Sequence, residues 1–112
     1  PHAKPFGEQA GELLVIGWGS TFGAIRSAVE LAIEEQMSVS HLHIRHINPF
    51  PENLGEVLLK YQKILIPELN MGQLSMLIRS KYLVDAEPMN KVEGKPFKLN
   101  ELYNKIKEML EN

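Results

Sequence analysis

The stretch that decides the fold is GWGSTFGAIRSAVELAIEEQ, residues 17–36, in which a glycine-rich turn leads into an amphipathic helix. It follows a mostly apolar run, residues 12–17, which predicts a short buried strand closed by glycine. Arg26 and Glu30 are expected to pair on the polar face of the helix. The apolar face recurs at helical spacing and consists of Ile25, Ala28, Val29, Ala32 and Ile33.

Three further segments predict strands. Residues 39–47, VSHLHIRHI, alternate apolar and polar side chains, as in a half-exposed strand near a sheet edge. Residues 64–66 are apolar throughout, and residues 83–86 predict a short fourth strand followed by a connection over 87–98. The remaining helices are predicted from the apolar stripes Leu54, Val57, Leu58 and Tyr61; Leu74, Leu77, Ile78 and Tyr82; and Leu99, Leu102, Tyr103, Ile106, Met109 and Leu110.

Strands that alternate with helices in this way predict an α/β domain with a mainly parallel sheet and helices on both of its faces. The fully apolar strands belong at the centre, which gives the strand order 2-1-3-4. Residues 1–10 are rich in Pro, Gly and polar side chains, and we expect a leader or linker there and one domain over residues 11–112. Ligands of such sheets bind where the strand order reverses, so the loops 17–21 and 68–73 are expected to face one crevice.

The turn carries Gly17, Gly19 and Gly23, a spacing close to the GxGxxG fingerprint of dinucleotide sites but different from it. The second strand ends at Arg45 and His46, where that fingerprint expects an acidic residue. An NADP-type site is one interpretation, and exposed N–H groups at the helix start could hold an anion. The favoured interpretation is structural: Gly17 and Gly19 permit tight backbone geometry, and Gly23 permits close packing of the helix on the sheet.

Polar residues at helix starts have both structural and chemical interpretations. Ser20 or Thr21 is expected to cap the first helix, and Asn70 with Gln73 fits a capping box. Glu68 follows a buried strand, where a carboxylate could act as a general base. The favoured alternative is a carboxylate held by helix-start N–H groups or by a neighbouring domain.

The histidines of the second strand also allow two interpretations. His41 and His43 share a strand face with His46 nearby, a spacing that could ligate a metal, but no third or fourth ligand is evident. We therefore favour a solvated strand edge and predict no metal site. Trp18 and Phe22 are large aromatic residues at a strand end, where such side chains often meet a partner, although a core role is equally open for Phe22. An exposed apolar surface is predicted near Trp18 and Phe50.

Composition excludes several classes of function. The chain has 112 residues, one domain's worth, and a net charge of -2, which gives no electrostatic basis for nucleic-acid binding. It has no cysteine, so disulfides, cysteine-ligated clusters and cysteine nucleophiles are excluded within it. No apolar stretch is long enough for a membrane span and no signal segment is evident, which predicts a soluble, cytoplasmic chain.

Five motifs in order resemble one family: GWGSTFGAIRSAVE, LHIRHINPFP, ILIPELNMGQL, IRSKYLVDA and KVEGKPF. They are similar to the C-terminal domain of the alpha subunit of 2-oxoacid:ferredoxin oxidoreductases, particularly the 2-oxoglutarate type. The resemblance implies a three-layer α/β/α sandwich like the transketolase C-terminal domain. It carries over the following residues as turns that shape a docking face, none of them catalytic: Gly17, Trp18, Gly19, Ser20, Thr21 and Gly23; Asn48, Pro49, Phe50 and Pro51; and Glu68, Asn70, Gly72 and Gln73.

For the whole enzyme, the resemblance implies conversion of a 2-oxoacid and coenzyme A to an acyl-CoA, carbon dioxide and reduced ferredoxin. Thiamine diphosphate with Mg²⁺ is then expected between the N-terminal part of the alpha subunit and the beta subunit, which also carries an iron–sulfur cluster. This chain lacks a GDG-type thiamine motif, so we expect no cofactor in it, no activity by itself, and an oligomeric assembly with those partners. Pro67 and Lys98 depart from the family's usual residues.

Two other interpretations stay open. One is a free-standing α/β module that holds a nucleotide or an anion at the Gly17–Gly23 loop. The other is the equivalent domain of a transketolase or of a 2-oxoacid dehydrogenase beta chain, which shares the fold but not the electron acceptor.

Overall fold

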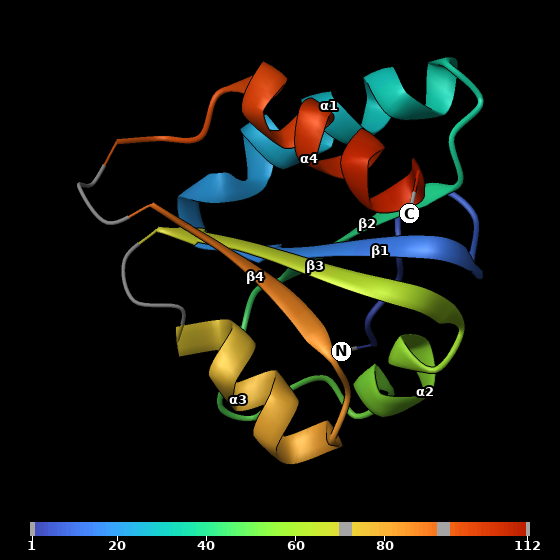
Figure 1. The fold of residues 1–112 in the computed structure, drawn as a ribbon. Coiled ribbons are helices and arrows are strands. Elements are labelled where there is room, and N and C mark those ends of the chain that lie inside the picture. The colour runs from blue at the N-terminus through green and yellow to red at the C-terminus, as the bar shows by residue number, and fades with distance from the viewer. Residues whose placement is uncertain (1, 70–72, 92–94, 112) are drawn as a thin grey trace.

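The computed structural model describes residues 2–69, 73–91 and 95–111, which contain a four-stranded parallel sheet in the order β2-β1-β3-β4 (Figure 1). The strands are β1 (Gly11–Trp18), β2 (Val39–Ile44), β3 (Tyr61–Leu69) and β4 (Ala86–Lys91). The helices are α1 (Phe22–Glu34), α2 (Leu54–Leu58), α3 (Gln73–Tyr82) and α4 (Leu99–Glu111), with a 3-10 turn, η1 (Gly19–Thr21), before α1.

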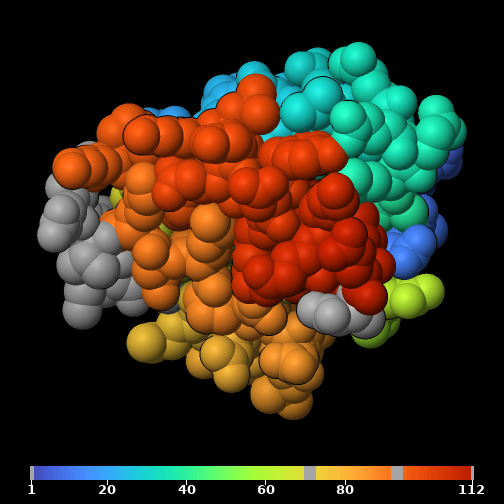
Figure 2. All heavy atoms as spheres, turned by 45° about the horizontal axis from the view of Figure 1, so that its top comes forward, coloured from blue at the N-terminus to red at the C-terminus, as the bar shows by residue number. Residues whose placement is uncertain are grey.

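The helices form a layer on each side of the sheet. Helices α1 and α4 cover one face and α2 and α3 the other, as Figure 1 shows. Figure 2 shows α4 beside α1 across the first of these faces. The predicted three-layer α/β/α class and the strand order 2-1-3-4 are therefore confirmed.

Strand β1 contributes to the core on both faces of the sheet. Leu14 and Ile16 pack toward α2 and α3, whereas Leu13 and Val15 pack toward α1 and α4, and all four are at most 1% exposed. Parallel strands buried on both faces favour continuous apolar runs, which explains why this segment shows no alternation of polar and apolar residues.

The fourth strand lies three residues later than predicted, at Ala86–Lys91 rather than 83–86. The N–H of Leu83 still donates to the carbonyl of Arg79, and Leu83 has a φ of 55°, so residue 83 belongs to the end of α3. β4 itself is an edge strand with the mostly polar sequence AEPMNK, and its Pro88 is tolerated because one side of an edge strand needs no hydrogen bond. The predicted connection over 87–98 is accordingly wrong for residues 87–91, which belong to β4, whereas residues 95–98 do form a connection.

Tyr61 was expected on a helix but is the first residue of β3. Helix α2 is short and ends at Leu58. The hydroxyl of Tyr61 donates to the carbonyl of Glu8 at 2.6 Å, and the hydroxyl of Ser40 donates to the same carbonyl at 2.6 Å. The N-terminal segment is thereby held against the domain.

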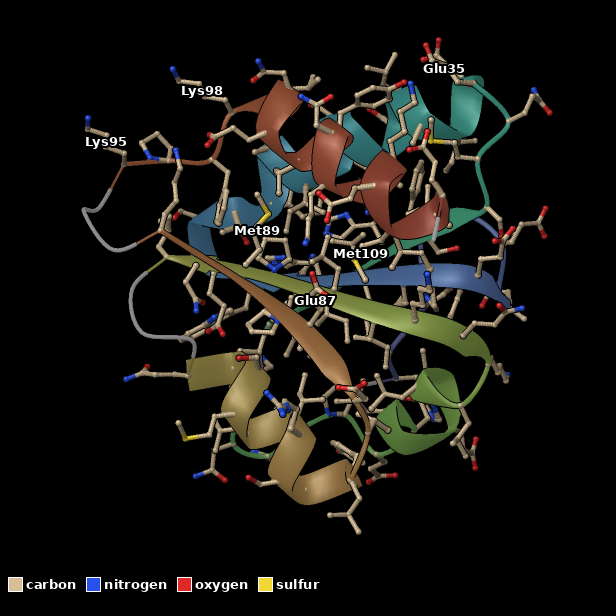
Figure 3. All side chains as sticks on the ribbon, viewed as in Figure 1. Glu35, Glu87, Met89, Lys95, Lys98 and Met109 are labelled. Atoms are coloured by element: carbon tan, nitrogen blue, oxygen red, sulfur yellow. The ribbon has the colours of Figure 1, made fainter. Side chains whose placement is uncertain are left out.

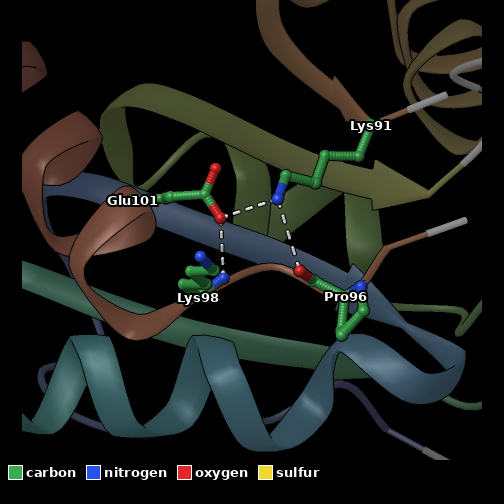
Figure 4. Close-up of polar contacts among 4 residues, drawn as sticks. All are labelled: Lys91, Pro96, Lys98 and Glu101. Carbon is green, nitrogen blue, oxygen red and sulfur yellow. Dashed lines mark hydrogen bonds and ion pairs between the residues drawn. The ribbon is translucent and has the colours of Figure 1, made fainter. Parts of the chain in front are cut away.

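Polar contacts attach helix α4 to β4 and to the loop that directly precedes α4 (Figure 4). Lys91 forms an ion pair with Glu101 at 2.8 Å and donates to the carbonyl of Pro96 at 3.4 Å. The N–H of Lys98 donates to the same Glu101 carboxylate at 2.9 Å, so Glu101 satisfies an N–H at the helix start where Lys98 cannot supply a capping hydroxyl.

Packing completes the attachment of α4 to the sheet. Met109 of α4 belongs to the core cluster between α4 and the sheet and points toward the strands in Figure 3. Glu87 of β4 forms an ion pair with Lys105 of α4. The hydroxyl of Tyr103 donates to Glu35, at the end of α1, which joins the two helices of this layer.

Candidate docking surface at the strand ends

Glu68 is the buried carboxylate at the carboxyl end of β3, and it is 1% exposed. Its Oε1 accepts the N–H of Leu74 at 2.6 Å, and its Oε2 accepts the N–H of Ser75 at 2.9 Å. These N–H groups belong to the first turn of α3, where backbone donors have no partner within the helix. The favoured interpretation of Glu68, a carboxylate held by helix-start N–H groups, is therefore the arrangement that the structure contains.

Trp18 links the ends of the two central strands. Its indole N–H donates to Oε1 of Glu68 at 3.4 Å. Its side chain packs against the core cluster between the sheet and helices α2 and α3. The ends of the two strands that were expected to face a common crevice are thus joined by this contact. Trp18 is half-buried, so the expectation of an exposed indole is corrected, and the exposed aromatic ring is that of Phe22, at 41%.

The glycines of the turn have different roles. A Cβ on Gly17 would collide with Cδ1 of Ile25 and lie 2.9 Å from Oγ1 of Thr21, so any larger residue would displace these side chains between β1 and α1. Gly19 has a φ of 65°, a left-handed conformation that favours glycine. Gly23 has no atom within 4 Å of its ideal Cβ position, so the prediction that it permits close helix packing is wrong.

The predicted side-chain cap of α1 is also absent. Thr21 lies at the N-cap position without a capping hydrogen bond from its side chain. Its hydroxyl donates instead to the carbonyl of Trp18 at 2.9 Å, which closes the tight turn η1. Ser20 is exposed, as is Gly19, so this part of the turn faces outward.

The loop after β2 places Phe50 against α3. The rings of Phe50 and Tyr82 lie 5.9 Å apart, and the ammonium of Lys81 lies 5.6 Å from the Phe50 ring centroid. Phe50 is half-buried, whereas Asn48 and Pro49 are exposed. Asn53, at the end of this loop, exchanges hydrogen bonds of 2.7 and 2.9 Å with the backbone of Ala3.

Gly19, Ser20, Phe22, Asn48, Pro49 and Phe50 line the carboxyl end of the sheet with exposed or half-buried side chains and backbone, and we call them the strand-end surface. Gln73, the first residue of α3, is also exposed. Asn70 and Gly72, predicted to shape this same face, lie outside the described residues, as does the predicted capping box of Asn70 with Gln73.

His41 does not lie on a solvated edge, as the sequence predicted, but is completely buried. Phe6 covers it, because the N-terminal segment pairs with β2 through hydrogen bonds between the backbones of Phe6 and His41. Arg26 donates from Nε to Nδ1 of His41 at 3.1 Å and lies 3.9 Å from the Phe6 ring centroid. The predicted pairing of Arg26 with Glu30 does not form within the described residues.

Burial and the neighbouring cations lower the pKa of both histidines. Burial, with smaller contributions from Arg26 and His43, lowers the pKa of His41 to about 3. Burial, then Arg45 and then Arg26, lowers the pKa of His43. The ring of Phe22 lies 5.0 Å from that of His43 and 5.5 Å from that of His41, so α1 and β2 join in one aromatic and cationic cluster.

Sequence reasoning missed this cluster. Arg26 and Phe6 each looked ordinary, one on a polar helix face and the other in a proline- and glycine-rich leader. The signal that could have found them is the pair of buried-strand histidines, because a buried imidazole requires a partner. Within the described residues no group of three or more His, Asp or Glu side chains is placed to hold a metal ion.

The comparisons with known proteins decide the family. Residues 11–102 match the family described as pyruvate:ferredoxin oxidoreductase core domain II. The chain belongs to this family. This chain is 50% identical over 91 residues to the 2-oxoglutarate oxidoreductase subunit KorA of Mycobacterium tuberculosis. The match covers 81% of this chain and 14% of that relative. The chain therefore spans about a seventh of the length of this curated relative.

Solved structures agree with this assignment. A 2-oxoglutarate:ferredoxin oxidoreductase from Magnetococcus marinus, solved with 2-oxoglutarate, coenzyme A and succinyl-CoA bound, superposes with a TM-score of 0.91 at 27% identity, covering 98% of this chain and 20% of that one. A split-gene transketolase superposes with a TM-score of 0.67 at 10% identity over 89% of this chain and 38% of that one. The second likeness shows the fold alone and confirms the expected resemblance to transketolase. None of the helices in the described ranges is long and apolar enough to cross a membrane.

Proposed function

We propose that this chain is a non-catalytic assembly domain of a 2-oxoacid:ferredoxin oxidoreductase alpha subunit, of the 2-oxoglutarate type. The observation that carries the proposal is the 50% identity to a 2-oxoglutarate oxidoreductase subunit of which this chain matches only a small part. The rest of such a subunit supplies surfaces against which this domain can dock.

The geometry at the strand ends supports a docking role rather than a catalytic one. In sheets of this kind, ligands bind beyond the carboxyl ends of the strands, commonly at helix-start N–H groups. Here the carboxylate of Glu68 accepts the N–H groups of Leu74 and Ser75 and the indole N–H of Trp18, so these donors are already used within the chain. The strand-end surface leaves Phe22 41% exposed, which a neighbouring protein surface would cover.

The whole enzyme is proposed to form an acyl-CoA and carbon dioxide from a 2-oxoacid and coenzyme A while reducing ferredoxin. Thiamine diphosphate, Mg²⁺ and the iron–sulfur cluster are proposed to be bound outside this chain, by the N-terminal part of the alpha subunit and by the beta subunit. This chain has no cysteine to ligate an iron–sulfur cluster. Its proposed contribution is the surface on which those parts assemble.

Assembly of the full alpha subunit with the beta subunit tests this proposal. The substitution Phe22→Ser removes an exposed ring, and Ser20→Trp adds bulk at an exposed position, both on the strand-end surface. Each is expected to weaken assembly by about tenfold or more, as measured by analytical ultracentrifugation, because buried aromatic contacts dominate interface energies. Activity of the assembled fraction should be unchanged, because neither residue is proposed to touch a reacting group.

Leu59→Ser is the matched control. Leu59 is 80% exposed, and it follows α2 and precedes β3, at the amino end of the strands. It should leave assembly unchanged. Assembly that is equally tight in all three variants, with their folds intact by circular dichroism, would reject the strand-end surface as the docking face.

A further inference from the structure

A pocket of about 810 Å³ overlaps the strand-end surface, sharing Phe22, Pro49 and Phe50 with it, and lies between the N-terminal segment, α1 and the end of β2. This volume falls within the range of small-molecule sites. We call it the basic pocket; it is lined by His2, Ala3, Lys4, Phe22, Arg26, His43, Arg45, His46, Pro49, Phe50, Pro51 and Glu52.

The basic pocket concentrates positive charge on an acidic domain. Its lining includes three side chains with a permanent positive charge, Lys4, Arg26 and Arg45, together with three histidines and one carboxylate, that of Glu52. The whole chain carries a net charge of -2. No ion pair within the described ranges involves Lys4, Arg26 or Arg45, so this charge is not balanced by neighbouring carboxylates. An anion is the ligand that such a pocket favours.

Arg26 is held in place before any ligand arrives. Its guanidinium lies 3.9 Å from the Phe6 ring centroid and 4.8 Å from that of Phe22. Its Nε is fixed by the hydrogen bond to His41, whereas its other N–H donors have no partner among the described residues. A guanidinium with a fixed plane and unused donors suits a phosphate group, which accepts two parallel N–H bonds.

The charges also act on one another. Arg45 and Arg26 both contribute to the lowered pKa of His43, after the larger effect of burial. This means that the three groups lie within electrostatic reach and raise the positive potential of the same space. A bound anion would reduce that repulsion.

The apolar part of the lining narrows the class of ligand. The rings of Phe22 and Phe50 and the prolines Pro49 and Pro51 line the same pocket as the cations. Aromatic side chains stack on nucleic-acid bases and are tolerant of which base it is. We propose that the basic pocket binds a nucleoside phosphate, with the phosphates at Arg26 and Arg45 and the base against the aromatic lining.

The test is a titration of the 112-residue chain with ADP, followed by NMR. The signals of Phe22, His43 and Arg45 are expected to shift together and to saturate. Arg45→Gln should weaken binding by about tenfold, because one charge-assisted hydrogen bond is lost. Arg45 is exposed, so this variant is expected to fold.

The matched control is Arg79→Gln, which removes the same charge from an exposed position on α3, outside the basic pocket. It should bind ADP as the unchanged chain does. A second readout is the pKa of His43, which bound ADP should raise because a nearby anion stabilises the protonated imidazole. A structural disturbance caused by Arg45→Gln does not depend on ADP, so a rise in the pKa of His43 on addition of ADP reports the bound anion itself.

Several outcomes would overturn the proposal. These are an absence of saturable binding at millimolar ADP, equal loss in the Arg45 and Arg79 variants, and shifts confined to residues outside the basic pocket. Pyrophosphate that binds as tightly as ADP would overturn the nucleoside part, and with it the proposal. Because the titration uses this chain by itself, it can fail while the assembly experiment succeeds, and the reverse.

Discussion

The indole N–H of Trp18, at the end of β1, lies 3.4 Å from the carboxylate oxygen Oε1 of Glu68, at the end of β3. The same carboxylate accepts the N–H groups of Leu74 and Ser75 in α3. One buried side chain thus connects both central strands to a helix on one face of the sheet. This role differs from general-base catalysis, because a base needs a lone pair available to a substrate.

Glu68→Ala is expected to lower the free energy of unfolding by about 2–3 kcal/mol, because it leaves buried helix-start N–H groups without acceptors. Glu68→Gln keeps one acceptor oxygen and should cost about 1 kcal/mol. Urea denaturation followed by circular dichroism measures both changes. The exposed Glu12→Ala serves as control and should change stability by less than about 0.5 kcal/mol. Equal stability of all variants would contradict a structural role for Glu68.

Two glycines of the same turn should respond oppositely to alanine. Gly17→Ala is expected to cost about 1–3 kcal/mol, because the new Cβ would collide with Cδ1 of Ile25, and this completely buried side chain would have to shift within the core. Gly23→Ala should stabilise the chain by about 0.5–1 kcal/mol, since the position is helical and open. Thermal and urea unfolding of the two variants gives the signs, and a destabilising Gly23→Ala would show that this glycine is needed for packing.

The elements that the sequence predicts correctly are those whose burial is set by local pattern. Residues 12–17 form a central strand because apolar side chains on both faces can only be buried by helices on both sides. The fourth strand was misplaced because β4 is a polar edge strand, and its only strong pairing is with β3, far away in sequence. The apolar residues Leu83 and Val84 predict a strand more strongly than the mostly polar sequence of β4 does.

In the candidate site, too, features set by local sequence can be predicted, whereas features set by distant contacts cannot. The left-handed turn at Gly19 follows from a glycine placed directly after a strand, and the structure contains it. Gly17 lies within β1 and is needed for side-chain packing against Ile25, not for the turn predicted there. The burial of His41 does not follow from the pattern of β2, because Phe6 covers this histidine from a segment more than thirty residues earlier. Such a contact depends on how the chain end returns to the sheet edge, which periodicity cannot encode.

The N-terminal segment should therefore contribute to stability. A chain that begins at Ala10 loses the Phe6 pairing with His41 and the hydrogen bonds from Tyr61 and Ser40 to Glu8. We expect a loss of about 3–6 kcal/mol, because the truncation removes one partly buried ring and six hydrogen bonds: two between Ala3 and Asn53, two between Phe6 and His41, and two to the carbonyl of Glu8. Tyr61→Phe in the full chain removes one hydrogen bond and should cost about 1 kcal/mol. Unchanged urea midpoints after the truncation would mean that residues 1–9 act as a leader outside the folded domain.

His41 should make folding stability depend on pH in a window set by its two pKa values. The pKa is about 3 in the folded chain and near 6.5 in the unfolded one, so the unfolded chain binds a proton first as the pH falls. The stability associated with neutral His41 is therefore complete above pH 6.5 and declines as the pH falls toward 3. The expected slope is about 1.4 kcal/mol per pH unit, or about 2 kcal/mol between pH 6.5 and pH 5.

Comparison with His41→Gln isolates this contribution, because glutamine does not titrate. The variant is expected to be less stable at pH 7, where it loses the packing of the imidazole, but to lose less further stability at pH 5 than the unchanged chain does. Chemical denaturation at the two pH values gives the difference between the slopes. His46→Gln is the matched control for the substitution itself, since it replaces an exposed histidine by the same residue. Parallel pH profiles for His41→Gln and the unchanged chain would show that His41 does not stay neutral in the fold, and that Arg26 and Phe6 do not shield it from protonation.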